Sequence, residues 1–166
     1  MTALFQEKRL TTRVCLTPSE LGREYRDIIF GKVSKQFENT CMVDIGYISR
    51  VLSLEQIHHE EVMRMLPNVF LLVSARVMAY FPRLADTVDL HVEFIFKNGV
   101  FGRFHKIQCL IPAVSWNGWE LRQDFSGTFL YHLESGRIIR KGDVVSVVLT
   151  TIRFEKDVFS CIAKIK

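Results

Sequence analysis

The sequence predicts an α+β protein of two units, and three observations carry that prediction. A helix-start signature stands at Thr17-Pro18-Ser19-Glu20. An Asn98-Gly99 pair separates two alternating apolar runs, which is the strongest short signal for a β-hairpin. Pro82 closes a long apolar strand. We therefore expect a helix on a curled antiparallel sheet over residues 1–82 and a five-stranded β-barrel over residues 83–166.

The first unit is built around the predicted helix. Thr17 can cap it, Pro18 suits its first position, and Glu20 can bond back to the backbone of Thr17. Apolar residues then recur at three- and four-residue spacing as far as Phe37, which predicts one helix over residues 18–37 with a single apolar stripe. The remaining pattern predicts strands at residues 11–16, 41–45, 48–52 and 69–81, with a polar loop at 55–65.

The second unit consists almost entirely of strands. We predict them at residues 88–96, 100–104, 107–111, 144–153 and 158–165, with a long polar connection between the third and fourth. Five strands with this spacing favour an OB barrel, a fold that often binds oligonucleotides. Trp116 and Trp119 lie in the long connection, where one of them can cover an end of the barrel or mark a contact surface.

Composition narrows the class of protein. Nearly half of the 166 residues are apolar, which is typical of a globular protein. The net charge is only +4, which is a smaller positive charge than a protein that binds duplex DNA usually carries. Four cysteines without CxxC spacing are expected to be reduced core residues in a reducing compartment. The N-terminus lacks a signal-peptide layout and no apolar run approaches the ~20 residues needed to span a bilayer. We expect a soluble intracellular protein without a membrane segment.

Catalytic and metal sites are not expected. The run His58-His59-Glu60-Glu61 lacks the HExxH spacing of a zinc helix, and adjacent histidines point to different sides of either a helix or a strand. A solvated loop or a partner contact is the better interpretation. The GxSxG, GxxxxGK[ST] and GxGxxG motifs are absent from the sequence. We expect neither an enzyme nor a cofactor.

The outer face of the barrel carries the candidate site. Strand alternation puts Val100, Gly102 and Phe104 on one side, and Phe101, Arg103 and His105 on the other. By the same count, the outer face of the preceding strand carries His91, Glu93 and Lys97. An exposed aromatic beside cations holds single-stranded RNA by stacking and phosphate attraction. The candidate RNA-binding residues are Lys97, Phe101, Arg103 and His105; the alternative is that the first unit simply covers Phe101.

In their order along the chain, these segments resemble the larger stalk subunit of archaeal and eukaryotic RNA polymerases, which is built from a tip domain and an OB domain. The resemblance spans nearly the whole chain. The segments that carry it are Leu16-Thr17-Pro18-Ser19 before the long helix, Cys41 to Ile48 followed by Val51-Leu52, Arg64-Met65-Leu66-Pro67, Val77 to Pro82, Asn98 to Gly102 and Ile138 to Val145.

The resemblance implies a non-catalytic subunit of a DNA-directed RNA polymerase. The tip, at Asp44, Ile45, Gly46 and Tyr47, would dock on the polymerase core near the clamp, with Ile45, Tyr47 and Ile48 as apolar anchors. The first unit would also hold a smaller helical partner, and the barrel would contact nascent single-stranded RNA. The implied location is the nucleus in a cellular eukaryote, and otherwise the cytoplasm or a virion. Two alternatives stay open: a free-standing RNA-binding OB protein, and a structural protein whose barrel binds only protein.

Overall fold

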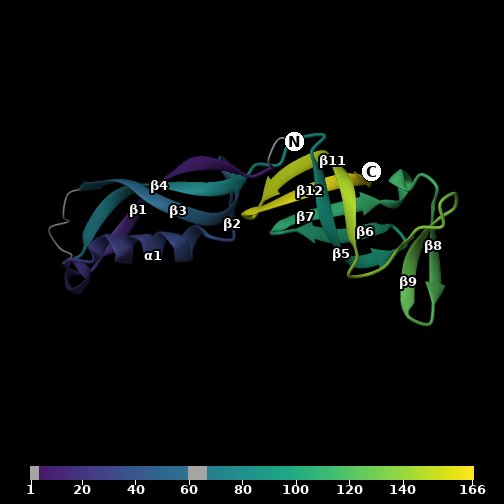
Figure 1. Ribbon diagram of the computed structural model, residues 1–166, viewed down its shortest axis with the longest axis horizontal. Coiled ribbons are helices and arrows are strands. Elements are labelled where there is room, and N and C mark those ends of the chain that lie inside the picture. The colour runs from purple at the N-terminus through teal and green to yellow at the C-terminus, as the bar shows by residue number, and fades with distance from the viewer. Residues whose placement is uncertain (1–3, 60–66) are drawn as a thin grey trace. The chain divides into compact units, whose positions relative to one another are not determined.

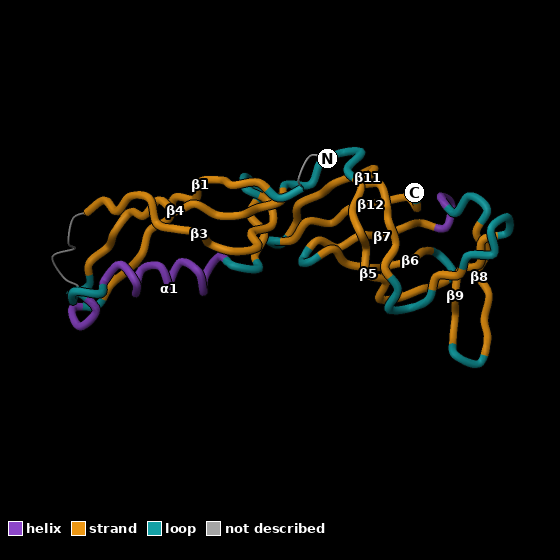
Figure 2. The backbone as a smooth tube through the Cα atoms, in the orientation of Figure 1, coloured by secondary structure: helices purple, strands orange, loops and turns teal. Residues whose placement is uncertain are grey.

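The structure is a computed structural model that describes residues 4–59 and 67–166 (Figure 1). The chain divides into two compact units, Met1–Phe81 and Pro82–Lys166. Strands make up most of both units, and the described residues contain one α-helix (Figure 2). The coarse prediction, a mostly β chain with one helix and a closed five-stranded barrel, is therefore confirmed.

The first unit holds a four-stranded antiparallel sheet. Its strands are β1 (Gln6–Leu16), β2 (Thr40–Met42), β3 (Gly46–His59) and β4 (Val69–Tyr80), and their order across the sheet is β1-β4-β3-β2. The two long central pairings place β4 between β1 and β3. Apolar residues of all these long strands point to one face, where Leu10, Ile48 and Val73 are almost completely buried.

Helix α1 (Tyr25–Phe37) covers that apolar face, with Ile29 and Val33 fully buried against the sheet (Figure 1). The prediction that the helix begins at residue 18 is wrong. Residues Pro18–Glu20 form a separate 3-10 turn, and the Glu20 carboxylate ion-pairs with Lys32 at 2.8 Å. In one continuous helix these residues would lie about 18 Å apart along the axis, so the pair requires the chain to fold back between them. The Glu20 bond from the Thr17 amide, 2.8 Å, is present as predicted.

Two boundaries around β3 also differ from the prediction. β2 ends at Met42, and residues 43–45 form the turn to β3, which starts at Gly46. β3 then continues to His59, so the loop predicted from residue 55 is wrong for residues 55–59. His58 is an exposed residue of this strand, paired with Leu72 of β4. Glu60 and Glu61, together with residues 64–66 of the resemblance, lie outside the described residues.

The second unit contains the closed barrel. Its strands are β5 (Thr87–Phe96), β6 (Gly99–Phe104), β7 (Ile107–Pro112), β11 (Val144–Glu155) and β12 (Val158–Ile165), which match the five predicted strands. They close in the order β11-β12-β7-β6-β5, with β7 and β12 parallel and β11 paired to β5. This closure is consistent with an OB barrel. Alternate residues fill its core, among them Leu90, Val100, Ile107, Val147 and Phe159.

The long polar connection predicted between the third and fourth barrel strands lies between β7 and β11, and it holds a second small sheet that the sequence did not predict. It contains a 3-10 turn (Ala113–Ser115) and strands β8 (Trp119–Asp124), β9 (Gly127–His132) and β10 (Ile138–Ile139), ordered β10-β9-β8. β8 is almost entirely exposed, so it lacks the apolar alternation that would have revealed it. Both tryptophans are half-buried, and the Trp119 ring packs on His132 at 4.8 Å between ring centres.

Candidate nucleic-acid interface

A β-bulge in β5 decides which side chains the barrel presents outward. β5 and β6 pair Val92 with Gly102 and then Phe94 with Phe101, so Glu93 is the extra residue. The alternation shifts by one after the bulge, and Phe94 becomes 57% exposed. The expectation that His91, Glu93 and Lys97 share the outer face of this strand is therefore only partly met, because the bulge brings phenylalanines to that face.

The bulge creates an aromatic pair on the outer face. The rings of Phe94 and Phe101 lie 6.3 Å apart between centres and tilt by 33°. Phe101 is half-buried and Phe94 is exposed. The Lys141 ammonium nitrogen lies 5.4 Å from the centre of the Phe94 ring. Two aromatic rings beside a lysine form a surface on which a base can stack while its phosphate meets a positive charge.

Backbone hydrogen bonds fix Lys141 beside this aromatic pair. The Gly142 amide donates to the carbonyl oxygen of Val92 at 2.8 Å, and the Val92 amide donates to that of Asp143 at 2.9 Å. These two bonds tie the turn before β11 to β5 at the bulge. Neither Lys141 nor Phe94 was among the RNA-binding residues that the sequence predicted. The sequence shows the alternating apolar run through Phe94 and Phe96, but it does not show the bulge that turns these side chains outward.

Of the predicted RNA-binding residues, Arg103 lies on the same face as Phe101. It is exposed, and its Nε is 3.4 Å from a carboxylate oxygen of Glu93. An exposed pair of this kind contributes about 0–1 kcal/mol, so a phosphate can compete for the guanidinium. Lys97 is exposed too, but it lies in the turn that joins β5 to β6 rather than on the strands.

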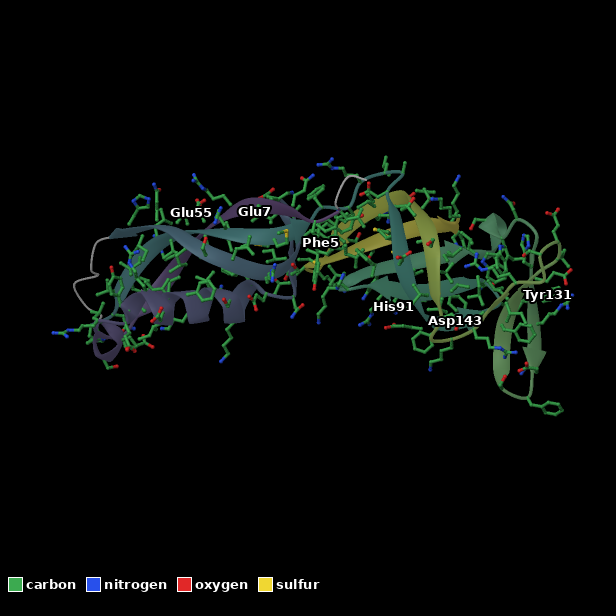
Figure 3. All side chains as sticks on the ribbon, viewed as in Figure 1. Phe5, Glu7, Glu55, His91, Tyr131 and Asp143 are labelled. Carbon is green, nitrogen blue, oxygen red and sulfur yellow. The ribbon has the colours of Figure 1, made fainter. Side chains whose placement is uncertain are left out.

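His105 is less suited to attracting phosphate than the sequence suggested. It follows β6 with a φ of 56°, and its ring meets that of Phe104 edge-on at 4.7 Å. Partial burial, with a smaller contribution from repulsion by His91, lowers the pKa of His105 below its ordinary value. The imidazole is therefore neutral at pH 7 and can offer hydrogen bonds but no charge. Figure 3 labels His91, an exposed residue of β5 paired with Arg103.

The predicted docking residues lie in and after the turn between β2 and β3, and most of them are buried. Asp44 is exposed, as is its neighbour Val43 at 55%. Ile45 belongs to the core of the first unit, and Tyr47 is 3% exposed. The expectation that Ile45, Tyr47 and Ile48 present apolar anchors is wrong, because all three side chains are buried, and Ile45 and Ile48 belong to the core of the first unit.

Tyr47 and Gly46 make close contacts within the first unit. The Tyr47 hydroxyl donates to the side-chain oxygen of Asn39 at 2.8 Å, its ring meets that of Phe5 edge-on at 6.3 Å, and burial raises its pKa. Gly46 has a φ of 101°, and a Cβ there would lie 2.3 Å from the carbonyl oxygen of Tyr80. Gly46 is thus needed for the close approach of β3 to β4.

Possible metal ligands and the cysteine thiols add little to the candidate site. In the residues that the structure describes, no cluster of three or more His, Cys, Asp or Glu side chains could hold a metal ion. All four cysteines are free thiols, and Cys41, Cys109 and Cys161 are buried, which confirms the expectation of reduced core residues for these three. A hydrogen bond with Cys161 and burial raise the pKa of Cys109, so this thiol stays protonated at neutral pH.

Among residues 4–59 and 67–166, no helix is both long and apolar enough to cross a membrane. A scan of protein-family models and a search of curated proteins both find no match to this chain.

Proposed function

We propose that the chain is a non-catalytic accessory subunit of a multisubunit DNA-directed RNA polymerase, of the larger stalk type, whose barrel contacts nascent single-stranded RNA. The observation that carries the proposal is the aromatic and cationic outer face formed by Phe94, Phe101, Arg103 and Lys141 on a closed OB-like barrel. The order of the units, a helix on an antiparallel sheet followed by that barrel, supports it as well.

The energetics of the outer face favour a bound base over the unbound arrangement. An exposed lysine over a phenylalanine ring is worth about 0.5–1 kcal/mol. A stacked base is worth about 1–3 kcal/mol, and a displaced Lys141 can move onto the phosphate of the same nucleotide. The modest net charge of +4 fits a short single strand, because few phosphates need to be neutralised.

Docking on the polymerase core would use the exposed part of the β2–β3 turn, Val43 and Asp44, rather than the buried residues that follow it. The first unit would also hold the smaller helical partner. Neither contact requires a catalytic residue in this chain.

Co-purification tests the proposal. A tagged full-length chain should bring down large polymerase subunits and a small helical protein from a lysate of its own source. A double variant, Val43→Glu with Asp44→Lys, should lose the large subunits while its circular dichroism spectrum stays that of the parent. Val114→Glu is the matched control, because Val114 is 92% exposed and lies on the second unit. Elution of the tagged chain alone, as a stable monomer, would reject the proposal.

A free-standing protein that binds single-stranded RNA is the second candidate. The same outer face favours it, because a base can stack on Phe94 and Phe101 without a partner protein. It predicts affinity for a short single-stranded RNA in the purified chain, weakened by salt and by Phe101→Ala or Arg103→Ala. No measurable binding at low salt would exclude this candidate and leave the docking role untouched.

A further inference from the structure

A groove of about 440 Å³ runs beside the aromatic pair within the second unit. One wall is β5 at residues 93–95, the other is the β8–β9 turn and the start of β9 at residues 126–128, and residues 140–141 complete the lining. Figure 2 shows the β8–β9 hairpin as a separate arm of this unit. The volume lies at the small end of the range for ligand pockets, which suits one nucleotide and excludes a duplex.

The wall formed by the hairpin is held firmly in place. Arg140 grips Asp124 with two hydrogen bonds of 2.6 and 3.3 Å, and donates a third to the Ser126 hydroxyl at 2.7 Å. Its guanidinium also lies 4.4 Å from the centre of the Phe129 ring. The hydrogen bonds from Arg140 hold the pKa of Asp124 well below its usual range, so the pair stays ionised through neutral and mildly acidic pH. Arg140 therefore has a structural role in this groove.

The other lining groups suit a nucleotide. Phe94 offers an exposed aromatic face, and Lys141 offers a positive charge beside it. A Cβ built on Gly127 would meet no atom within 4 Å, so the backbone there is open to close approach. Glu93, the one carboxylate among the residues that line the groove, is paired with Arg103. The groove thus combines a stacking ring, an available cation and an accessible backbone.

We propose that this groove holds one unpaired nucleotide of single-stranded RNA, with the base stacked on Phe94, the phosphate on Lys141 and the backbone of Gly127 against the nucleotide. The proposal deepens the proposed function and rests on it for the choice of RNA as the ligand. It also assigns the inserted sheet a role, because the β8–β9 turn supplies the wall that a bare five-stranded barrel would lack.

The first test measures affinity of the full chain for a fluorescently labelled hexauridylate by anisotropy at low salt. Phe94→Ala should weaken binding about 5- to 150-fold, the loss expected for one stacked base. Phe125→Ala is the matched control, because Phe125 lies fully exposed in the same hairpin turn but does not line the groove. It should change the affinity less than twofold. Equal losses in the two variants would overturn the proposal.

The second test locates the nucleotide. Adenosine 5′-monophosphate added to the isotope-labelled full chain should shift the backbone amide signal of Gly127, and Lys141→Gln should abolish that shift. Lys141→Gln should also reduce the salt slope of RNA binding by about 0.7, the value for one phosphate contact to a single strand. If neither the mononucleotide nor the RNA shifts the Gly127 amide signal, the proposed nucleotide site is refuted.

The outcomes separate this proposal from the proposed function. If the tagged chain co-purifies with a polymerase but RNA does not shift the Gly127 amide signal, only the proposed nucleotide site is wrong. If Gly127 responds and Phe94→Ala weakens binding while no polymerase subunit co-purifies, only the stalk assignment is wrong.

Discussion

Gly46 should be essential for the stability of the first unit. A non-glycine residue at its φ of 101° is strained by about 1–3 kcal/mol. The added Cβ of Gly46→Ala would also lie 2.3 Å from the carbonyl oxygen of Tyr80, which forces β3 and β4 apart locally. Overpacking of this kind costs about 1–3 kcal/mol. Together these terms predict a loss of about 2–6 kcal/mol in the free energy of unfolding of the first unit.

The two units can be followed separately in one urea titration. The α-helix of the described residues belongs to the first unit, so ellipticity at the helical band reports on that unit. Both tryptophans, Trp116 and Trp119, belong to the second, so fluorescence reports on the barrel unit. With a slope of about 1 kcal/mol per molar urea, Gly46→Ala should lower the ellipticity midpoint by about 2 M or more and leave the fluorescence midpoint in place.

Gly31→Ala is the matched control for this change. Gly31 lies inside α1, where an added Cβ meets no atom within 4 Å, so alanine should stabilise the first unit by about 0.5–1 kcal/mol. The two glycine-to-alanine changes should therefore move the ellipticity midpoint in opposite directions. An unchanged midpoint for Gly46→Ala would refute the packing argument and reopen the view of Gly46 as an exposed docking residue.

Three further predictions concern the second unit. Gly102→Ala should lower the urea midpoint seen by tryptophan fluorescence, because its Cβ would lie 2.4 Å from the carbonyl oxygen of His91; an unchanged midpoint would contradict this. The Ser126 amide, which donates to Asp124, should keep its NMR shift from pH 7 to pH 4, since the carboxylate loses its proton far below that range; a titration near pH 4 would show the ion pair to be absent. The lowered pKa of His105 means that the folded state favours the neutral imidazole, so its contribution to stability should be constant above about pH 6.5 and decline below it. His105→Asn keeps a residue that tolerates the positive φ and should flatten that decline, measured by urea unfolding at pH 7.5 and 5.5; an identical decline in both proteins would exclude His105 as its source.

Local patterns in the sequence were enough to find the barrel strands. The Asn98-Gly99 turn and the alternation on either side of it predicted β5 and β6, and similar alternation predicted β7, β11 and β12. These signals succeed because a strand with one buried face must alternate, and because a tight hairpin turn depends on few residues. The helix was found too, but its start was misplaced, since a capping signature does not show whether the helix continues past its first turn.

The sequence predicted only half of the candidate site, because its signals are local. The sequence pointed to Phe101 and Arg103, whose outward direction follows from alternation within one strand. Phe94 and Lys141 were missed, because a bulge at Glu93 and a turn bonded to Val92 bring them to that face. The bulge arises in the pairing of β5 with the next strand, β6, and the turn is bonded to β5 from a much later part of the chain. Alternation within one strand encodes neither of these pairings.

The docking residues show the clearest division between sequence and tertiary structure. By itself, the chain determined that it forms two units, a helix with an antiparallel sheet and then a barrel, because each element carries its own periodicity. Only the tertiary structure decided that Gly46 and Tyr47 are buried while Val43 is exposed. The same sequence pattern, a glycine between apolar residues, occurs both in exposed turns and where two strands approach each other closely. The difference is made by the backbone of Tyr80, more than thirty residues away, which lies against Gly46.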